Sequence, residues 1–146
     1  MSYSIDTNIL LYASDRESDH HQKAKQFMES RVDDQDLLCL TWGILMSYQR
    51  IATHPSIFRN PLSAKQAWGN VESLLSLSRC RVIGEQEGFA GVYAQISNLV
   101  GVKGNFVPDA HLAVILKQHG VSKIYTADTD FRKFDFMEVI NPLNGD

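Results

Sequence analysis

Four aspartates stand at places in the chain from which their carboxylates can meet. Asp6 and Asp128 each follow a short apolar stretch. Asp109 lies in the first turn of a predicted helix, and Asp130 is two residues beyond Asp128. Carboxylates brought together repel and raise one another's pKa unless a cation lies among them, and oxygen ligands of this kind suit Mg²⁺ or Mn²⁺ better than zinc. One interpretation is therefore a divalent-metal site, and the other is that each aspartate only caps a helix or a turn.

The aspartates can converge only if the fold brings strand ends and helix starts to one edge. The sequence predicts strands at Tyr3–Ile5, Leu37–Leu40, Arg81–Ile83, Lys123–Thr126 and Val139–Ile140. It predicts helices that begin near Ile9, cover Ser18–Arg31, run from Thr41 to His54, start after Ser63, cover Phe89–Leu99, and run from Pro108 to Gly120. This alternation is typical of an α/β fold with a central, mostly parallel sheet of about four to five strands flanked by helices. Ligands bind at the carboxyl ends of such strands, which is where the aspartates are expected.

The composition is that of one ordinary globular domain, and we expect it to span residues 1–146. The chain is 44% hydrophobic and 21% charged, and no apolar run approaches the ~20 residues of a membrane helix. No secretory signal is expected, and Cys39 and Cys80 are expected to be buried free thiols, which favours the cytoplasm. The net charge of −3 argues weakly against nucleic-acid binding, but less so for an enzyme whose bound cations neutralise its own carboxylates.

Four segments, in order along the chain, have a pattern that is known from one family. They read SIDTNILLYA, TWGILMSYQRIATHPSIF, VPDAHLAVILKQHG and IYTADTDFRKF. Together they resemble PIN domains, and in particular the VapC-type toxin ribonucleases of toxin–antitoxin systems. The resemblance extends from Ser4 to about Phe134. It implies a single PIN-like domain and a metal-dependent endoribonuclease that hydrolyses RNA phosphodiesters with a metal-activated water.

The resemblance also implies roles for individual acids. Asp6, Asp109 and Asp128 would hold Mg²⁺ or Mn²⁺. Asp130 would assist as a further catalytic residue, directly or through water.

Polar neighbours of these acids also receive roles from the resemblance. Asn8 and Thr126 would orient the carboxylates. The family usually has a glutamate three residues before the arginine that matches Arg50, and this sequence has Ser47 there. No other acid lies between residues 37 and 57. Arg50 shares a helical face with Ser47, where it would contact an RNA phosphate, pair with a site acid, or form an ordinary surface ion pair.

Two hypotheses about function follow. The first is an RNA-cleaving toxin with a cognate antitoxin protein and a homodimeric state, for which exposed apolar stretches around Trp42, Trp68 and Phe58 are candidate contacts. The second is a catalytically degenerate PIN fold, lacking the usual glutamate at Ser47, that binds RNA or a protein without cleaving.

Overall fold

The sheet at the centre of the molecule has five parallel strands. The computed structural model describes residues 1–144. The strands are β1 (Ser2–Ile5), β2 (Leu37–Leu40), β3 (Cys80–Val82), β4 (Lys123–Tyr125) and β5 (Glu138–Ile140). Their spatial order is β3-β2-β1-β4-β5, and every neighbouring pair is parallel. The first strand is therefore central, and the chain builds outward from it on both sides.

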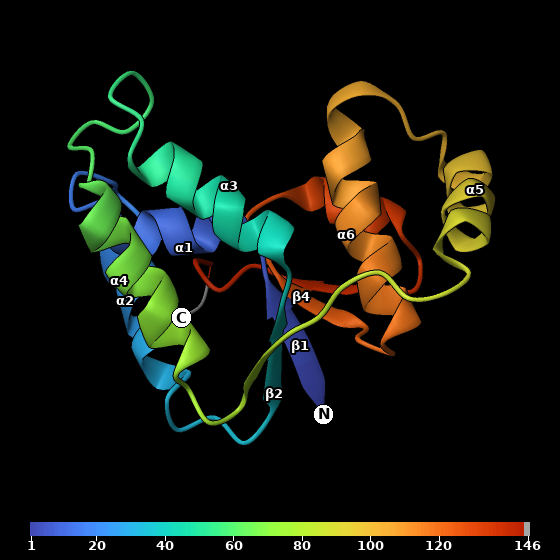
Figure 1. The fold of residues 1–146 in the computed structure, drawn as a ribbon, viewed down its shortest axis with the longest axis horizontal. Coiled ribbons are helices and arrows are strands. Elements are labelled where there is room, and N and C mark those ends of the chain that lie inside the picture. The colour runs from blue at the N-terminus through green and yellow to red at the C-terminus, as the bar shows by residue number, and fades with distance from the viewer. Residues whose placement is uncertain (145–146) are drawn as a thin grey trace.

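Helices lie on both sides of this sheet (Figure 1). They are α1 (Thr7–Ser14), α2 (His21–Ser30), α3 (Trp42–Ala52), α4 (Ala64–Leu75), α5 (Phe89–Val100) and α6 (Val107–Gln118), with two short 3₁₀ turns, η1 (Gly104–Phe106) and η2 (Thr129–Lys133). The first four helices lie to one side of β1 and β2, and α5 and α6 lie to the other. This layering buries both faces of the sheet, as parallel sheets require.

Side-chain caps determine where several helices begin. The Asp6 carboxylate accepts from the Thr7 amide at the start of α1. The Thr41 hydroxyl accepts from the Ile44 amide at the start of α3. Ser63 and Gln66 form a reciprocal capping box at the start of α4. Such caps satisfy amide groups that have no partner inside the helix.

The hydrophobic core lies between the sheet and the helices. Ile5, Leu40 and Ile124 on the three central strands have no exposed surface. Helix α6 is the most deeply buried, with Ala113 and Val114 fully enclosed. Its C-terminus is closed by Gly120, whose φ of 70° lies in the left-handed region that favours glycine.

These observations confirm the predicted α/β class and each predicted strand and helix, with changes at the ends. Helix α2 is shorter than predicted, because residues 18–20 form turns before it. Cys39 is a buried free thiol, whereas Cys80 is also free but only partly buried. No helix among residues 1–144 is long and apolar enough to cross a membrane.

Candidate active site

The ends of β1 and β4 place two of the predicted aspartates at one edge of the sheet. Ile5 and Tyr125 are register partners at the carboxyl ends of these two central strands. The Asp6 amide extends this pairing by donating to the Tyr125 carbonyl at 2.9 Å. Asp6 and Asp128 therefore emerge from adjacent strands on the same side.

Three carboxylates converge at this edge. Asp109, Asp128 and Asp130 each offer an oxygen, and these atoms all lie within 4.8 Å of one another. Asp109 comes from the first turn of α6, and the other two come from the segment after β4. The Asp128 carboxylate also caps η2 by accepting from the Asp130 amide at 2.9 Å. The cap interpretation and the cluster interpretation thus both hold for Asp128.

Asp6 is not a member of this mutual group of three, but its charge raises the pKa of Asp109 more than the charge of Asp128 or Asp130 does. The trio of Asp6, Asp109 and Asp128 stays a prediction. Oδ2 of Asp6 accepts from the Thr126 hydroxyl at 2.8 Å and from the Asn8 amide at 3.4 Å. Its other oxygen accepts from the Thr7 amide at 2.8 Å. These contacts hold the Asp6 carboxylate in one orientation.

Thr126 links the ends of the two strands. Its side chain is buried, and its hydroxyl oxygen accepts from the Asp128 amide at 3.0 Å and from the Asn8 side-chain amide at 3.3 Å. The Asn8 carbonyl oxygen in turn accepts from the Ala127 amide at 3.3 Å. Thr126 and Asn8 therefore have the orienting contacts that the sequence comparison implied for them.

Burial and mutual repulsion disfavour charge on the clustered acids. Burial, and after it the charges of Asp6, Asp128 and Asp130, together raise the pKa of the Asp109 carboxyl to about 7. Burial also raises the pKa of Asp6, against the hydrogen bonds from Thr126 and Thr7. An acid with a pKa near neutrality, held among other acids, is typical of a functional site that a cation would complete.

A cleft of about 370 Å³ opens over these acids. Asp6 and Asp109 line it, together with Trp42 and Ser47 from α3. Ser47 lines this cleft with its hydroxyl, at the position where the sequence resemblance implies a glutamate. Arg50 is exposed one turn further along α3, and no carboxylate within residues 1–144 forms an ion pair with it.

The cleft also contains a pair that the sequence analysis did not assign. Glu85 and His111 both line it, and their side chains are hydrogen-bonded at 2.8 Å. The bond from His111 lowers the pKa of Glu85. Glu85 lies three residues beyond the end of β3, so the strand-end rule that selected Asp6 would have found it too.

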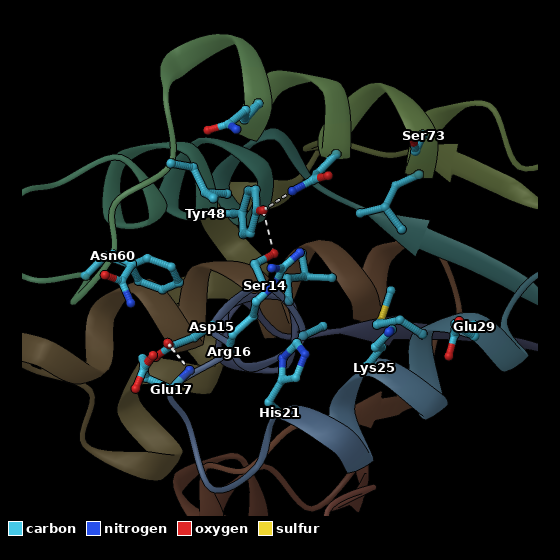
Figure 2. Close-up of a pocket in the computed structure, with 18 of the residues that line it drawn as sticks. Ser14, Asp15, Arg16, Glu17, His21, Lys25, Glu29, Tyr48, Asn60 and Ser73 are labelled. Carbon is cyan, nitrogen blue, oxygen red and sulfur yellow. Dashed lines mark hydrogen bonds between the residues drawn. The ribbon is translucent and has the colours of Figure 1, made fainter.

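A second and larger hollow of about 870 Å³ lies away from the acids, among α1, α2, α3 and α4. Figure 2 shows Ser14 and Tyr48 pointing toward each other across it, with hydroxyls 2.7 Å apart. The Asn70 amide donates to the same Tyr48 hydroxyl at 2.9 Å. Phe58 lines this hollow and is only 6% exposed. The prediction that Phe58 lies on an exposed apolar surface is therefore wrong, because the chain after α3 folds it inward.

A parallel α/β sheet with acids at its carboxyl edge is the arrangement expected of a PIN domain, and comparison with known proteins identifies the family. The family model described as the PIN domain matches residues 3–137. Ribonuclease VapC48 of Mycobacterium tuberculosis is 37% identical over 145 residues, which cover 99% of this chain and all of the relative. Ribonuclease VapC37 of the same organism is 30% identical, with 90% of each chain covered. The chain belongs to the PIN domain family.

Solved structures have the same fold. The structure of Mycobacterium tuberculosis VapC20, described as a toxin that cleaves the sarcin–ricin loop, matches with a TM-score of 0.69 at 18% identity and covers 95% of this chain and 99% of its own. FitAcB from Neisseria gonorrhoeae also matches with a TM-score of 0.69, at 21% identity over 97% of this chain and 99% of its own. At these identities the matches establish the fold alone.

Proposed function

We propose that this protein is a divalent-metal-dependent endoribonuclease of a toxin–antitoxin system. The observation that carries the proposal is the convergence of Asp109, Asp128 and Asp130 beside Asp6 at the carboxyl edge of the sheet. The names of its relatives, Ribonuclease VapC48 and Ribonuclease VapC37, support RNA as the substrate.

The donor set fits Mg²⁺ or Mn²⁺, because it consists only of carboxylate oxygens without histidine or cysteine sulfur. A bound ion of this kind supplies an activated water and neutralises charge on the phosphate. Asp109, Asp128 and Asp130 would hold the ion together with Asp6. Thr126 and Asn8 donate hydrogen bonds to the Asp6 carboxylate and would orient it toward the ion.

The absence of a carboxylate at Ser47 favours a weaker ion site rather than a lost one. Asp6 and Asp109 line the cleft, Asp128 and Asp130 cluster with Asp109, and a hydroxyl at Ser47 can bind a water or a substrate oxygen there. A degenerate fold that only binds RNA or protein is the alternative.

We also infer the partners and the setting. Solved relatives include VapBC2 from Rickettsia felis bound to promoter DNA and a toxin–antitoxin complex from Klebsiella pneumoniae, which supports a cognate antitoxin for this chain. A homodimer remains a prediction, with Trp42 and Trp68 as its exposed candidates. An RNA substrate and free thiols fit a cytoplasmic location.

The experiment is cleavage of labelled RNA by the wild-type protein with Mn²⁺ or Mg²⁺, compared with EDTA. Asp6→Asn removes one site carboxylate, and Asp135→Asn removes an exposed acid outside the cluster. We expect cleavage that needs the ion, survives Asp135→Asn, and falls by at least about a hundredfold in Asp6→Asn, a loss typical of disturbed metal sites. Cleavage that persists in EDTA or in Asp6→Asn would contradict the proposal, and binding of RNA without cleavage would favour the degenerate alternative.

A further inference from the structure

An exposed pair of tryptophans stands at the mouth of the acidic cleft. Trp42 is 49% exposed and lines the cleft, and Trp68 on α4 is 37% exposed. Their rings are stacked with centroids 6.5 Å apart and an interplanar angle of 10°. Large aromatic side chains that gather at the surface beside a functional site usually have a binding role.

The backbone fixes Trp42 relative to the acids. Helix α3 begins directly after β2, which is hydrogen-bonded to β1 in the sheet. Thr41 caps the helix with its buried side chain, so the position of the Trp42 backbone is set by the sheet. Trp42 therefore lies just beyond the carboxyl end of β2, and Asp6 lies just beyond the carboxyl end of the adjacent strand β1.

The chain segment that carries the tryptophans contains basic residues and no acid. No aspartate or glutamate occurs between residues 37 and 71, although the whole chain carries a net charge of −3. Within this acid-free segment, Arg50 on α3 and Lys65 on α4 are exposed, and neither forms an ion pair with a carboxylate of residues 1–144. The Gln49 side chain bonds to the Ala64 carbonyl and so holds this end of α3 against the start of α4.

We propose that this surface, the α3–α4 face formed by Trp42, Met46, Arg50, Lys65 and Trp68, binds single-stranded RNA beside the cleft. Trp42 stacks on a base next to the phosphodiester that lies over the acids, Trp68 supports the Trp42 ring, and Arg50 contacts a phosphate. Helices α3 and α4 are neighbours in the fold (Figure 1), and the stacked rings of Trp42 and Trp68 join their two parts of the face. Aromatic stacking joined to a basic track is the general means of binding unpaired nucleic acid.

The same apolar surface also meets the description of a dimer contact, but two features favour RNA. In a symmetric dimer this face would meet its own copy, whose residues 37–71 include no acid to pair with Arg50 and Lys65. Such a dimer would also cover the mouth of the cleft that Trp42 lines. The RNA proposal rests on the ribonuclease function proposed above. Binding of RNA is therefore measured separately from its cleavage.

The test is binding of a labelled single-stranded oligoadenylate, measured in the Asp6→Asn background so that the probe stays intact. Trp42→Ala should weaken binding about tenfold, since stacking one base contributes about 1–3 kcal/mol. Trp42→Phe should retain most of the affinity. Leu99→Ala is the matched control, because Leu99 is an apolar residue on α5 that is 80% exposed, and it should bind as the parent does. Arg50→Gln should lower the slope of log affinity against log salt by about 0.7.

Measurements of mass in solution and melting temperature accompany each variant. If Trp42→Ala binds the oligonucleotide as tightly as the parent, the proposal is overturned. If it instead converts a dimer to a monomer with unchanged RNA affinity, the face is a protein interface. Cleavage by the wild-type chain is measured in parallel: its failure would count against the ribonuclease, whereas an effect of Trp42→Ala on binding would still support the α3–α4 face.

Discussion

At the scale of single residues, Ser47 is the position where the resemblance to VapC-type toxins implies a glutamate that this chain lacks. It lines the cleft with Asp6 and Asp109, and a longer acidic side chain there would reach toward the same space. The affinity of a hard cation follows the number and charge of its oxygen ligands. Ser47 therefore offers a direct way to change the ion site without touching the aspartates.

We expect Ser47→Glu to have opposite effects with and without the ion. In EDTA the variant should melt at a lower temperature than wild type, because the new charge meets the other carboxylates unpaired. With Mn²⁺ it should bind the ion about tenfold more tightly and cleave RNA faster. Calorimetric titration and thermal melting measure both effects.

Met46→Glu is the control for this substitution. It adds the same charge one residue away, on a side chain that is 44% exposed to solvent, and should leave Mn²⁺ affinity unchanged. Equal Mn²⁺ binding by Ser47→Glu and Met46→Glu would show that Ser47 does not face the ion.

At the scale of elements, the first turn of α6 holds Asp109 among other acids. In the absence of a cation, the folded structure disfavours the charged form of Asp109. The N-terminus of a helix stabilises a carboxylate, yet burial and three neighbouring acids together raise the pKa of Asp109 to about 7. The unfolded chain has no such environment, so the proton is held more tightly in the folded state.

This difference predicts a pH dependence of the ion-free protein. A raised pKa stabilises the fold at pH values below the unfolded pKa of 3.8, and this contribution is lost as the pH rises through about 7. In EDTA, Asp109→Asn should therefore gain stability relative to wild type as the pH rises from about 4 to about 7, and the difference should then level off. Urea unfolding of both proteins across this range measures it. A difference that is constant with pH would show that Asp109 ionises normally.

The sequence rules predicted some of these elements and their site residues better than others. Alternating apolar stretches were enough to predict the sheet, and the strand-end rule then selected Asp6 and Asp128. The closeness of Asp130 to Asp109 depends on the 3₁₀ turn η2, which has no periodicity to recognise. Glu85 lies three residues beyond β3, within reach of the same strand-end rule, but its hydrogen bond to His111 joins segments that local patterns do not connect. The burial of Phe58 depends on helices that are distant in the sequence, which local patterns do not encode.

At the scale of the whole molecule, charge is distributed unevenly. Four of the 17 acids lie together at the carboxyl edge of the sheet, while the segment from residue 37 to residue 71 has none. Such an arrangement attracts cations to one place and leaves an adjacent surface open to phosphate. The modest net charge of −3 is therefore compatible with RNA as a substrate.

The central claim is that the aspartates at this edge form one divalent-cation site. Its most direct test is the melting temperature with and without Mn²⁺, for wild type, Asp6→Asn, Asp109→Asn and Asp135→Asn. An ion at about 100 times its dissociation constant adds about 2.7 kcal/mol, which for a chain of this size raises the melting temperature by about 5–10 °C. The account predicts that rise in wild type and Asp135→Asn, and its loss in Asp6→Asn and Asp109→Asn. An equal rise in all four proteins would show that Mn²⁺ binds elsewhere and would contradict the account.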